Sequence, residues 1–150
     1  MPAIYDEVVL ECCKEDAFKE ISTVAFMKSI DPNFGRDTIV LVENRRLIRS
    51  VSRVKGIGDV EIERVMFPEV SAIVTHRRPP LGPFTYQLSI QLLTDHKDGC
   101  LLRWTNEFEL NEENRPRQEA ILGYIRKNDR ENLVKIRLHF AQRKQERSLS

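Results

Sequence analysis

GPFTYQLSIQLLTDHKDGCLLRWTNEFEL, residues 82–110, consists of two long segments separated by a short polar stretch. Apolar and polar residues alternate along both segments, which is the pattern of a strand with one buried face. Between them, Asp95 to Gly99 supplies the polar and glycine residues typical of a hairpin loop. This stretch therefore predicts an antiparallel β-hairpin.

Further strand patterns precede the hairpin. They are separated by turn signals such as Gly56 to Asp59 and the pair Pro79-Pro80. We expect additional strands at residues 4–12, 37–43, 46–56, 59–67 and 70–78. Together with the two strands of the hairpin, these make an antiparallel sheet of about seven strands.

Helical patterns flank this run of strands. Residues 14–31 place apolar side chains on one stripe and predict either one helix or a broken pair of short helices. Residues 117–147 predict one long helix. The order predicts an α+β fold, in which a curved antiparallel sheet wraps around a long C-terminal helix and two short helices follow the first strand. We expect a single domain over residues 1–150, since no repeat or linker interrupts the chain.

Composition excludes several classes of protein. Lysine and arginine (24) nearly balance aspartate and glutamate (23), which argues against a nucleic-acid partner. The N-terminal residues show no export signal, and no apolar stretch is long enough to span a membrane, so we expect a cytoplasmic protein. Cys12, Cys13 and Cys100 are odd in number and two are adjacent, which indicates buried thiols rather than disulfides.

Arg64 interrupts the apolar face of a strand. In DVEIERVMF, residues 59–67, alternation places Val60, Ile62 and Met66 on the same face as Arg64. Burying a guanidinium group alone is costly. Arg64 is therefore either paired with a nearby carboxylate or placed in a polar cavity, where it could bind an oxygen anion.

Two more cations end the next strand. His76, Arg77 and Arg78 are consecutive, so one arginine points inward and the other outward, and the sequence does not decide which. The inward arginine either belongs to a solvated strand end or converges with Arg64 on one concavity.

The second hairpin strand carries an amide among aromatic residues. Asn106 shares a face with Trp104 and Phe108, and such a buried amide either bonds to backbone groups or serves a ligand. Phe84 and Tyr86 alternate on the preceding strand. Aromatic walls of this kind belong to a core or to a site for a flat or apolar ligand.

Other chemistries find no support in the sequence. The three histidines have no metal-ligand spacing with one another or with the cysteines, and no Ser-His-Asp arrangement is suggested. Gly56 to Gly58 lacks the longer pattern of a phosphate-binding loop. We expect neither a metal nor a cofactor. The basic run at 135–144 either complements the negative end of the last helix or docks an acidic partner.

HRRPPLGPFTY (76–86), followed by DGCLLRWTNEFEL (98–110), resembles the aromatase/cyclases of aromatic polyketide biosynthesis. These proteins belong to the START-like (SRPBCC, Bet v 1-like) helix-grip superfamily and show similar His-Arg, Gly-Pro-Phe-x-Tyr and Arg-Trp-x-x-Glu-Phe motifs. The specific match covers about residues 60–110. The resemblance implies a helix-grip fold with an internal hydrophobic cavity.

The resemblance also implies roles for individual residues. By motif and spacing, two family arginines and an amide look like Arg64, Arg77 and Asn106, which would be catalytic. Arg78 could stand in for Arg77, because one extra residue precedes Gly82. The side chains expected to bind the substrate are Phe34, Val60, Ile62, Met66, Arg78, Phe84, Tyr86, Trp104, Phe108 and Tyr124. Phe34 is the aromatic residue nearest to the family's entrance tyrosine, and Val60 is among the residues that stand where some family pockets have tryptophan.

The implied activity is the folding of a poly-β-ketone held by an acyl carrier protein, aldol closure of its first ring, and dehydration to an aromatic. Positioning would supply much of the rate, and arginine would stabilise an enolate or ketone oxygen. The alternatives are a non-catalytic binding or transport protein for a small hydrophobic ligand, lipid or polyketide, and a protein-interaction module. A monomer and a homodimer are both compatible with the sequence.

Overall fold

The chain forms one seven-stranded antiparallel sheet. The computed structural model describes residues 3–30, 37–54, 56, 58–78 and 82–149. The strands follow the order β1-β7-β6-β5-β4-β3-β2. Their bounds are β1 (Ala3–Leu10), β2 (Thr38–Glu43), β3 (Leu47–Val54), β4 (Gly58–Phe67), β5 (Ala72–Arg77), β6 (Phe84–His96) and β7 (Gly99–Leu110). The antiparallel sheet predicted from the alternating segments is thus confirmed.

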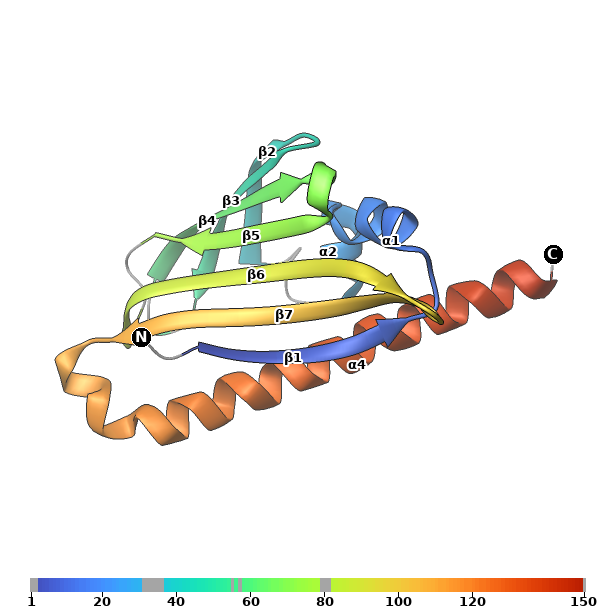
Figure 1. Cartoon of the computed structure of the whole chain (residues 1–150). Helices are drawn as coiled ribbons and strands as arrows, with labels where there is room; N and C mark the ends of the chain where they lie inside the picture. The colour runs from blue at the N-terminus through green and yellow to red at the C-terminus, as the bar shows by residue number, and fades with distance from the viewer. Residues whose placement is uncertain (1–2, 31–36, 55, 57, 79–81, 150) are drawn as a thin grey trace.

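Three α-helices lie in the described ranges of the chain. The short helices α1 (Lys14–Ile21) and α2 (Val24–Ile30) follow β1, and the long helix α4 (Gln118–Leu149) ends the described chain. Figure 1 shows α4 running alongside β1, while the strands turn progressively until β2 stands steeply across them. The predicted curved sheet with a long C-terminal helix is confirmed. None of the helices in the described ranges is long and apolar enough to cross a membrane.

The apolar core gathers where α1, α2 and α4 meet one face of the sheet, here named the inner face. Helices α1 and α2 contribute Phe18, Ile21 and Phe26, and every strand of the sheet interior contributes at least one buried apolar residue. The strand members of this core are Leu10, Ile48, Met66, Ile73, Leu93, Cys100 and Leu102. The dry core therefore occupies the end of the inner face that lies under the two short helices.

Helix α4 uses one narrow stripe to join this core. Leu133, Ile136 and Phe140 are buried at the i, i+3 and i+7 positions of the helix. Tyr124 lies nine residues before Leu133, about half a turn away around the helix, and is 75% exposed. The prediction that Tyr124 faces a substrate cavity is therefore wrong.

Strand β6 departs from the regular alternation that the sequence predicts. Phe84 pairs with Leu110, but Tyr86 pairs with Glu109, so one extra residue lies in β6 between them. Such a bulge reverses the faces of every residue that follows. Phe84 therefore stays on the inner face, whereas Tyr86 lies on the outer face beside His76, and its predicted role in substrate binding is wrong.

Beyond the bulge, β6 is here called an inverted strand, because its polar residues lie on the inner face and its apolar residues mostly on the outer face. Its inner-face residues are Gln87, Ser89, Gln91 and Leu93, and its outer-face residues are Tyr86, Leu88, Ile90 and Leu92. Polar side chains thus face the helices, while apolar ones face away from them. This arrangement opposes the usual burial preference and marks the inner face as a polar surface over part of its length.

Gly99 fixes the close approach of the β6–β7 hairpin to the end of β1. Its φ is +141°, and a Cβ atom there would lie 2.1 Å from the backbone oxygen of Leu10. We expect Gly99→Ala to lower the free energy of unfolding by at least about 2 kcal/mol, because it adds both strain and overlap. Urea denaturation measures the effect.

Gly123 is the matched control, because it lies in α4 and a methyl group added there would meet no atom within 4 Å. Gly123→Ala should raise the free energy of unfolding by about 0.5–1 kcal/mol, since alanine favours the helix. Equal effects of the two substitutions would contradict the role given to Gly99.

Candidate functional site

A polar row crosses the middle of the inner face. Consecutive cross-strand partners place Arg64 (β4), Thr75 (β5), Ser89 (β6) and Asn106 (β7) side by side. The row ends in apolar residues, Ile48 on β3 and Ile4 on β1. Neighbouring strands lie about 4.8 Å apart, so Arg64 and Asn106 are separated by roughly 14 Å along the sheet. The row therefore joins a cation and an amide through two hydroxyl-bearing residues.

Arg64 is a buried cation without a carboxylate partner among the described residues. It is 6% exposed, and its Nη2 donates to Gln91 Oε1 at 3.1 Å. Its Nη1 is buried and has no hydrogen-bond partner there. Burial lowers the pKa of the guanidinium to about 10, so Arg64 stays charged at neutral pH.

The glutamates that flank Arg64 in the sequence lie on the opposite face of β4. Glu61 accepts from Arg49, and Glu63 accepts from Arg78 at 2.8 Å. The structural ion pair considered for Arg64 is therefore wrong. Of the two alternatives for Arg64, an ion pair or a cation in a polar site, the second remains. Arg64 is a cation on the inner face with a free hydrogen-bond donor.

Arg77 and Arg78 point to opposite faces of the sheet. Arg77 pairs with Ile62 on the inner face, and its Nη1 donates to Gln87 Oε1 at 3.3 Å. Arg77 is exposed as a whole residue, but partial loss of solvent around its guanidinium lowers the pKa of Arg77, and the Asp129 carboxylate opposes this shift. Arg78 lies on the outer face with Glu63, so its predicted contact with a substrate in the cavity is wrong.

Asn106 bonds to a carboxyl group on the long helix. It is 6% exposed, and its Nδ2 donates to Asp129 Oδ2. Asp129 is 5% exposed, and burial raises the pKa of its carboxyl group to about 6. The hydrogen bond from Asn106 and the charge of Arg77 oppose this rise, while the charge of Asp6 adds to it. Asn106 thus holds a side chain that can gain or lose a proton near neutral pH.

Asp129 was not identified from the sequence, because it lies in the charged run Arg126 to Glu131. The one indication in the sequence that Asp129 is buried is its spacing from the apolar residues of the helix. It stands four residues before Leu133 and therefore on the buried stripe of α4.

The other predicted substrate-binding residues lie on the inner face, with one exception that the structure does not describe. Phe84 and Phe108 pack edge to face with their ring centroids 5.5 Å apart. The Trp104 indole N–H donates to Ser89 Oγ at 2.7 Å. Val60, Ile62 and Met66 share the face of Arg64, with Met66 in the dry core. Phe34 lies outside the described residues.

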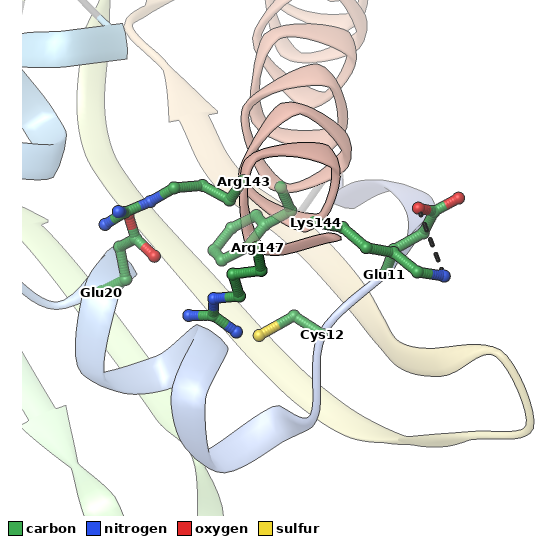
Figure 2. A pocket seen from close by; sticks show the side chains of 7 residues that line it. Glu11, Cys12, Glu20, Arg143, Lys144 and Arg147 are labelled. Atoms are coloured by element: carbon green, nitrogen blue, oxygen red, sulfur yellow. Dashed lines mark hydrogen bonds and ion pairs between the residues drawn. The ribbon is translucent and has the colours of Figure 1, made fainter. Parts of the chain in front are cut away.

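A separate pocket of about 110 Å³ lies at the other end of α4. Figure 2 shows its charged side chains reaching toward one another from α4 and from the segment around α1. Arg143 Nη2 lies 2.8 Å from Glu20 Oε1, and Lys144 Nζ lies 3.7 Å from Glu11 Oε2. Burial would raise the pKa of Glu20, but hydrogen bonds from His139 and Arg143 lower it. These contacts tie α1 to α4, and we place the functional site elsewhere, on the polar row.

The cysteines are free thiols in three different environments. Cys100 is buried, Cys12 is half-buried and Cys13 is exposed, so the prediction of buried thiols is wrong for Cys13. Burial raises the pKa of Cys12 and that of Cys100, the latter to about 12. Both thiols are therefore protonated at neutral pH. Across the described ranges, no group of three or more His, Cys, Asp or Glu side chains could hold a metal ion.

Neither a protein-family model nor a curated protein matches the sequence of this chain. Several solved structures do. The di-domain aromatase/cyclase BexL from the BE-7585A biosynthetic pathway matches with a TM-score of 0.74 at 13% identity, over 95% of this chain and 47% of BexL. The chain thus spans about half the length of BexL. The Zhui aromatase/cyclase from Streptomyces sp. R1128 matches with a TM-score of 0.69 at 11% identity, over 95% and 94% of the two chains.

Another match shows that the fold is shared more widely. Aha1 from Colwellia psychrerythraea, solved as a dimer, matches with a TM-score of 0.68 at 10% identity, over 93% and 96% of the chains. The structure therefore has the α+β helix-grip fold, which the aromatase/cyclases BexL and Zhui share. At these identities the likeness establishes the fold, and the function must be argued from the site.

Replacing Arg64 by methionine tests whether its buried charge lowers the free energy of unfolding. We expect Arg64→Met to leave the free energy of unfolding unchanged or to raise it by up to about 2 kcal/mol, because a buried charge without a carboxylate partner is removed. Arg78→Met, which breaks an exposed ion pair, should lower it by no more than about 1 kcal/mol. A loss above about 2 kcal/mol in Arg64→Met would show that the cation is structural.

Asp129 should make stability depend on pH. Its pKa is about 6 in the folded protein and 3.8 for an ordinary aspartate, as in an unfolded chain, so the folded state holds more of this proton between those values. The stability that the protonated group supplies is complete below the lower value and is lost as pH rises through about 6.

We therefore expect the difference in unfolding free energy between Asp129→Asn and the unmodified chain to shift in favour of the variant from pH 4 to 7. Thermal denaturation at a series of pH values measures this difference. A difference that does not change with pH would mean that Asp129 titrates normally.

Proposed function

We propose that the protein is a polyketide aromatase/cyclase-like enzyme that binds a poly-β-ketone against the polar row. Arg64 carries this proposal, because it is a buried cation whose free donor has no acceptor in the described parts of the chain. A substrate oxygen would supply that acceptor. The fold shared with BexL and Zhui, both described as aromatase/cyclases, supports the same reading.

The inverted strand β6 supports a carbonyl-rich substrate. A poly-β-ketone has a carbonyl oxygen on every second carbon, so it needs donors spread along the wall of its site. Gln87 and Gln91 project amide groups from β6 onto the inner face, next to Arg77 and Arg64 respectively. The oxygen of each amide already accepts from an arginine, so the amide N–H groups are the donors that a carbonyl oxygen could use.

The proposed reaction needs a base, a cation and a proton donor. A base removes a proton from the carbon between two ketones, and Arg64 stabilises the resulting enolate oxygen. The enolate carbon then attacks a second ketone, a carbon–carbon bond forms, and the alkoxide takes up a proton. Loss of water completes the step, and no oxidant or reductant is required.

Asp129 suits the proton transfers of this reaction. Its pKa of about 6 makes the carboxylate abundant at neutral pH and still able to return the proton it takes. Asn106 orients this carboxyl group, and Arg77 adds a second cation on the same face. Arg64, with a pKa of about 10, serves as the electrostatic group rather than the acid.

The second candidate is a non-catalytic binding protein for a small hydrophobic ligand that bears one anionic oxygen. Such an oxygen would satisfy Arg64 without any reaction, and Phe84 and Phe108 would contact the apolar part. In both cases the substrate or ligand occupies the inner face. An acyl carrier protein is the expected partner for the enzyme, and a free small molecule is the expected ligand for the binding protein.

Product analysis by mass spectrometry separates the two functions. The protein is added to a minimal poly-β-ketone synthase with its carrier protein, and the aromatic products are compared with those of the synthase alone. We expect a new aromatic product, which Arg64→Met reduces by about 100-fold or more, because an electrostatic donor at the reacting oxygen is lost.

Arg77→Met and Arg78→Met form the matched pair, because these adjacent arginines lie on opposite faces of β5 and its end. Arg77→Met should reduce the product, whereas Arg78→Met should not. An unchanged product spectrum with synthases of several chain lengths, together with tight ligand binding, would favour the binding protein.

A further inference from the structure

Asp6 on β1 lies at the edge of the polar row and has an unusual environment. It pairs with Trp104, two residues from the pair of Ile4 with Asn106, and therefore lies on the inner face one step from Asn106. Its Oδ1 accepts from Arg130 Nε at 3.2 Å. Its Oδ2 is buried and has no hydrogen-bond partner among the described residues. A buried carboxylate oxygen without a donor is costly and calls for a missing proton.

Asp129 is placed to supply that proton. Helix α4 packs along β1, and its consecutive residues Asp129 and Arg130 both reach the β1–β7 side of the sheet. Asn106 already donates to Asp129 Oδ2. If the other oxygen of Asp129 carries a proton, it becomes a donor, and Asp6 Oδ2 becomes its acceptor.

We propose that Asp6 and Asp129 form a carboxyl pair that holds one proton between them, with Asp129 as the donor and Asp6 as the ionised member. Arg130 fixes the ionised state of Asp6, and Asn106 fixes the orientation of Asp129. The pair explains why one oxygen of Asp6 is buried without a partner, because two adjacent carboxylates do not both ionise readily.

The charges that act on Asp129 come from two strands and the helix. Asp6 lies on β1, Arg77 on β5 and Arg130 on α4 itself, while Asn106 on β7 is neutral. The effect of Asp6 on Asp129 raises the pKa of that carboxyl group, and the effect of Arg77 lowers it. Asp6 is thus a positioning residue that sets when Asp129 holds its proton.

This pair also gives the proposed reaction its proton store, a role that rests on the proposed function. Asp129 takes the proton from the substrate carbon and then releases it to the alkoxide or to the departing hydroxide. Asp6 keeps that proton on Asp129 between the steps. The pair itself is inferred from the separate contacts of the two carboxyl groups with Arg130 and Asn106 and from the unpartnered oxygen of Asp6.

Carbon-13 NMR titration of the aspartate carboxyl groups in the full chain tests the pair. We expect Asp129 to titrate above the ordinary aspartate range, at about 6. Asp6→Asn should lower the pKa of Asp129 by about one unit or more, since a negative neighbour is removed. Asp98→Asn, in the exposed β6–β7 turn, is the control and should leave the titration of Asp129 unchanged.

An Asp129 titration that Asp6→Asn leaves unchanged would overturn the proposal. If Asp6→Asn does not fold, Asp6→Ser provides the same test, because it also removes the negative charge. The pH profile of product formation is the second readout, and its acid limb should shift downward in Asp6→Asn. A shifted Asp129 titration without any product would retain the pair and refute the proposed enzyme, whereas product with an unshifted profile would refute the role of the pair.

Discussion

The alternation of β4 separates Arg64 from the carboxylates nearest to it in the chain. Glu61 and Glu63 are two of its closest sequence neighbours, yet they bond to Arg49 and Arg78 on the outer face. Gln91 is the single acceptor that Arg64 receives on the inner face within the described ranges. A charged group so placed costs free energy, and the polar row around it reduces that cost. The polar residues nearest to Arg64 on the inner face therefore help to accommodate this cation.

Much of the fold could be predicted, because alternation and helical periodicity are properties of local sequence. Strand β7 buries Cys100, Leu102 and Phe108 as its pattern indicates, and α4 buries the stripe that ends in Phe140. The bulge in β6 could not be predicted in this way. The sequence from Phe84 to Leu92 alternates without a break, and only the pairing with β7 shows that Thr85 is an extra residue.

The same distinction applies to the site: residues marked by the local sequence pattern could be predicted, and residues positioned by tertiary contacts could not. Arg64 and Asn106 could be identified because each is a polar residue on an apolar face. The choice between Arg77 and Arg78 could not be made, since neighbouring residues on a strand always face opposite sides, and the register with Ile62 decides it. Asp129 stands among charged residues that resemble a solvent-facing stretch, so its burial depends on how α4 meets β7.

The dry core and the polar row are complementary parts of one arrangement. Leu133, Ile136 and Phe140 anchor α4 in the apolar core, and Glu20 of α1 binds Arg143 further along the helix. Asp129 lies one turn before the first of these anchors, so its position over Asn106 is set by packing outside the polar row. A proton-transferring group held in this way needs little reorganisation when a substrate binds. The stability of the core thus compensates for the unfavourable burial of Arg64 and Asp129. Helix α4, which the core anchors, holds Asp129 in a fixed position over Asn106.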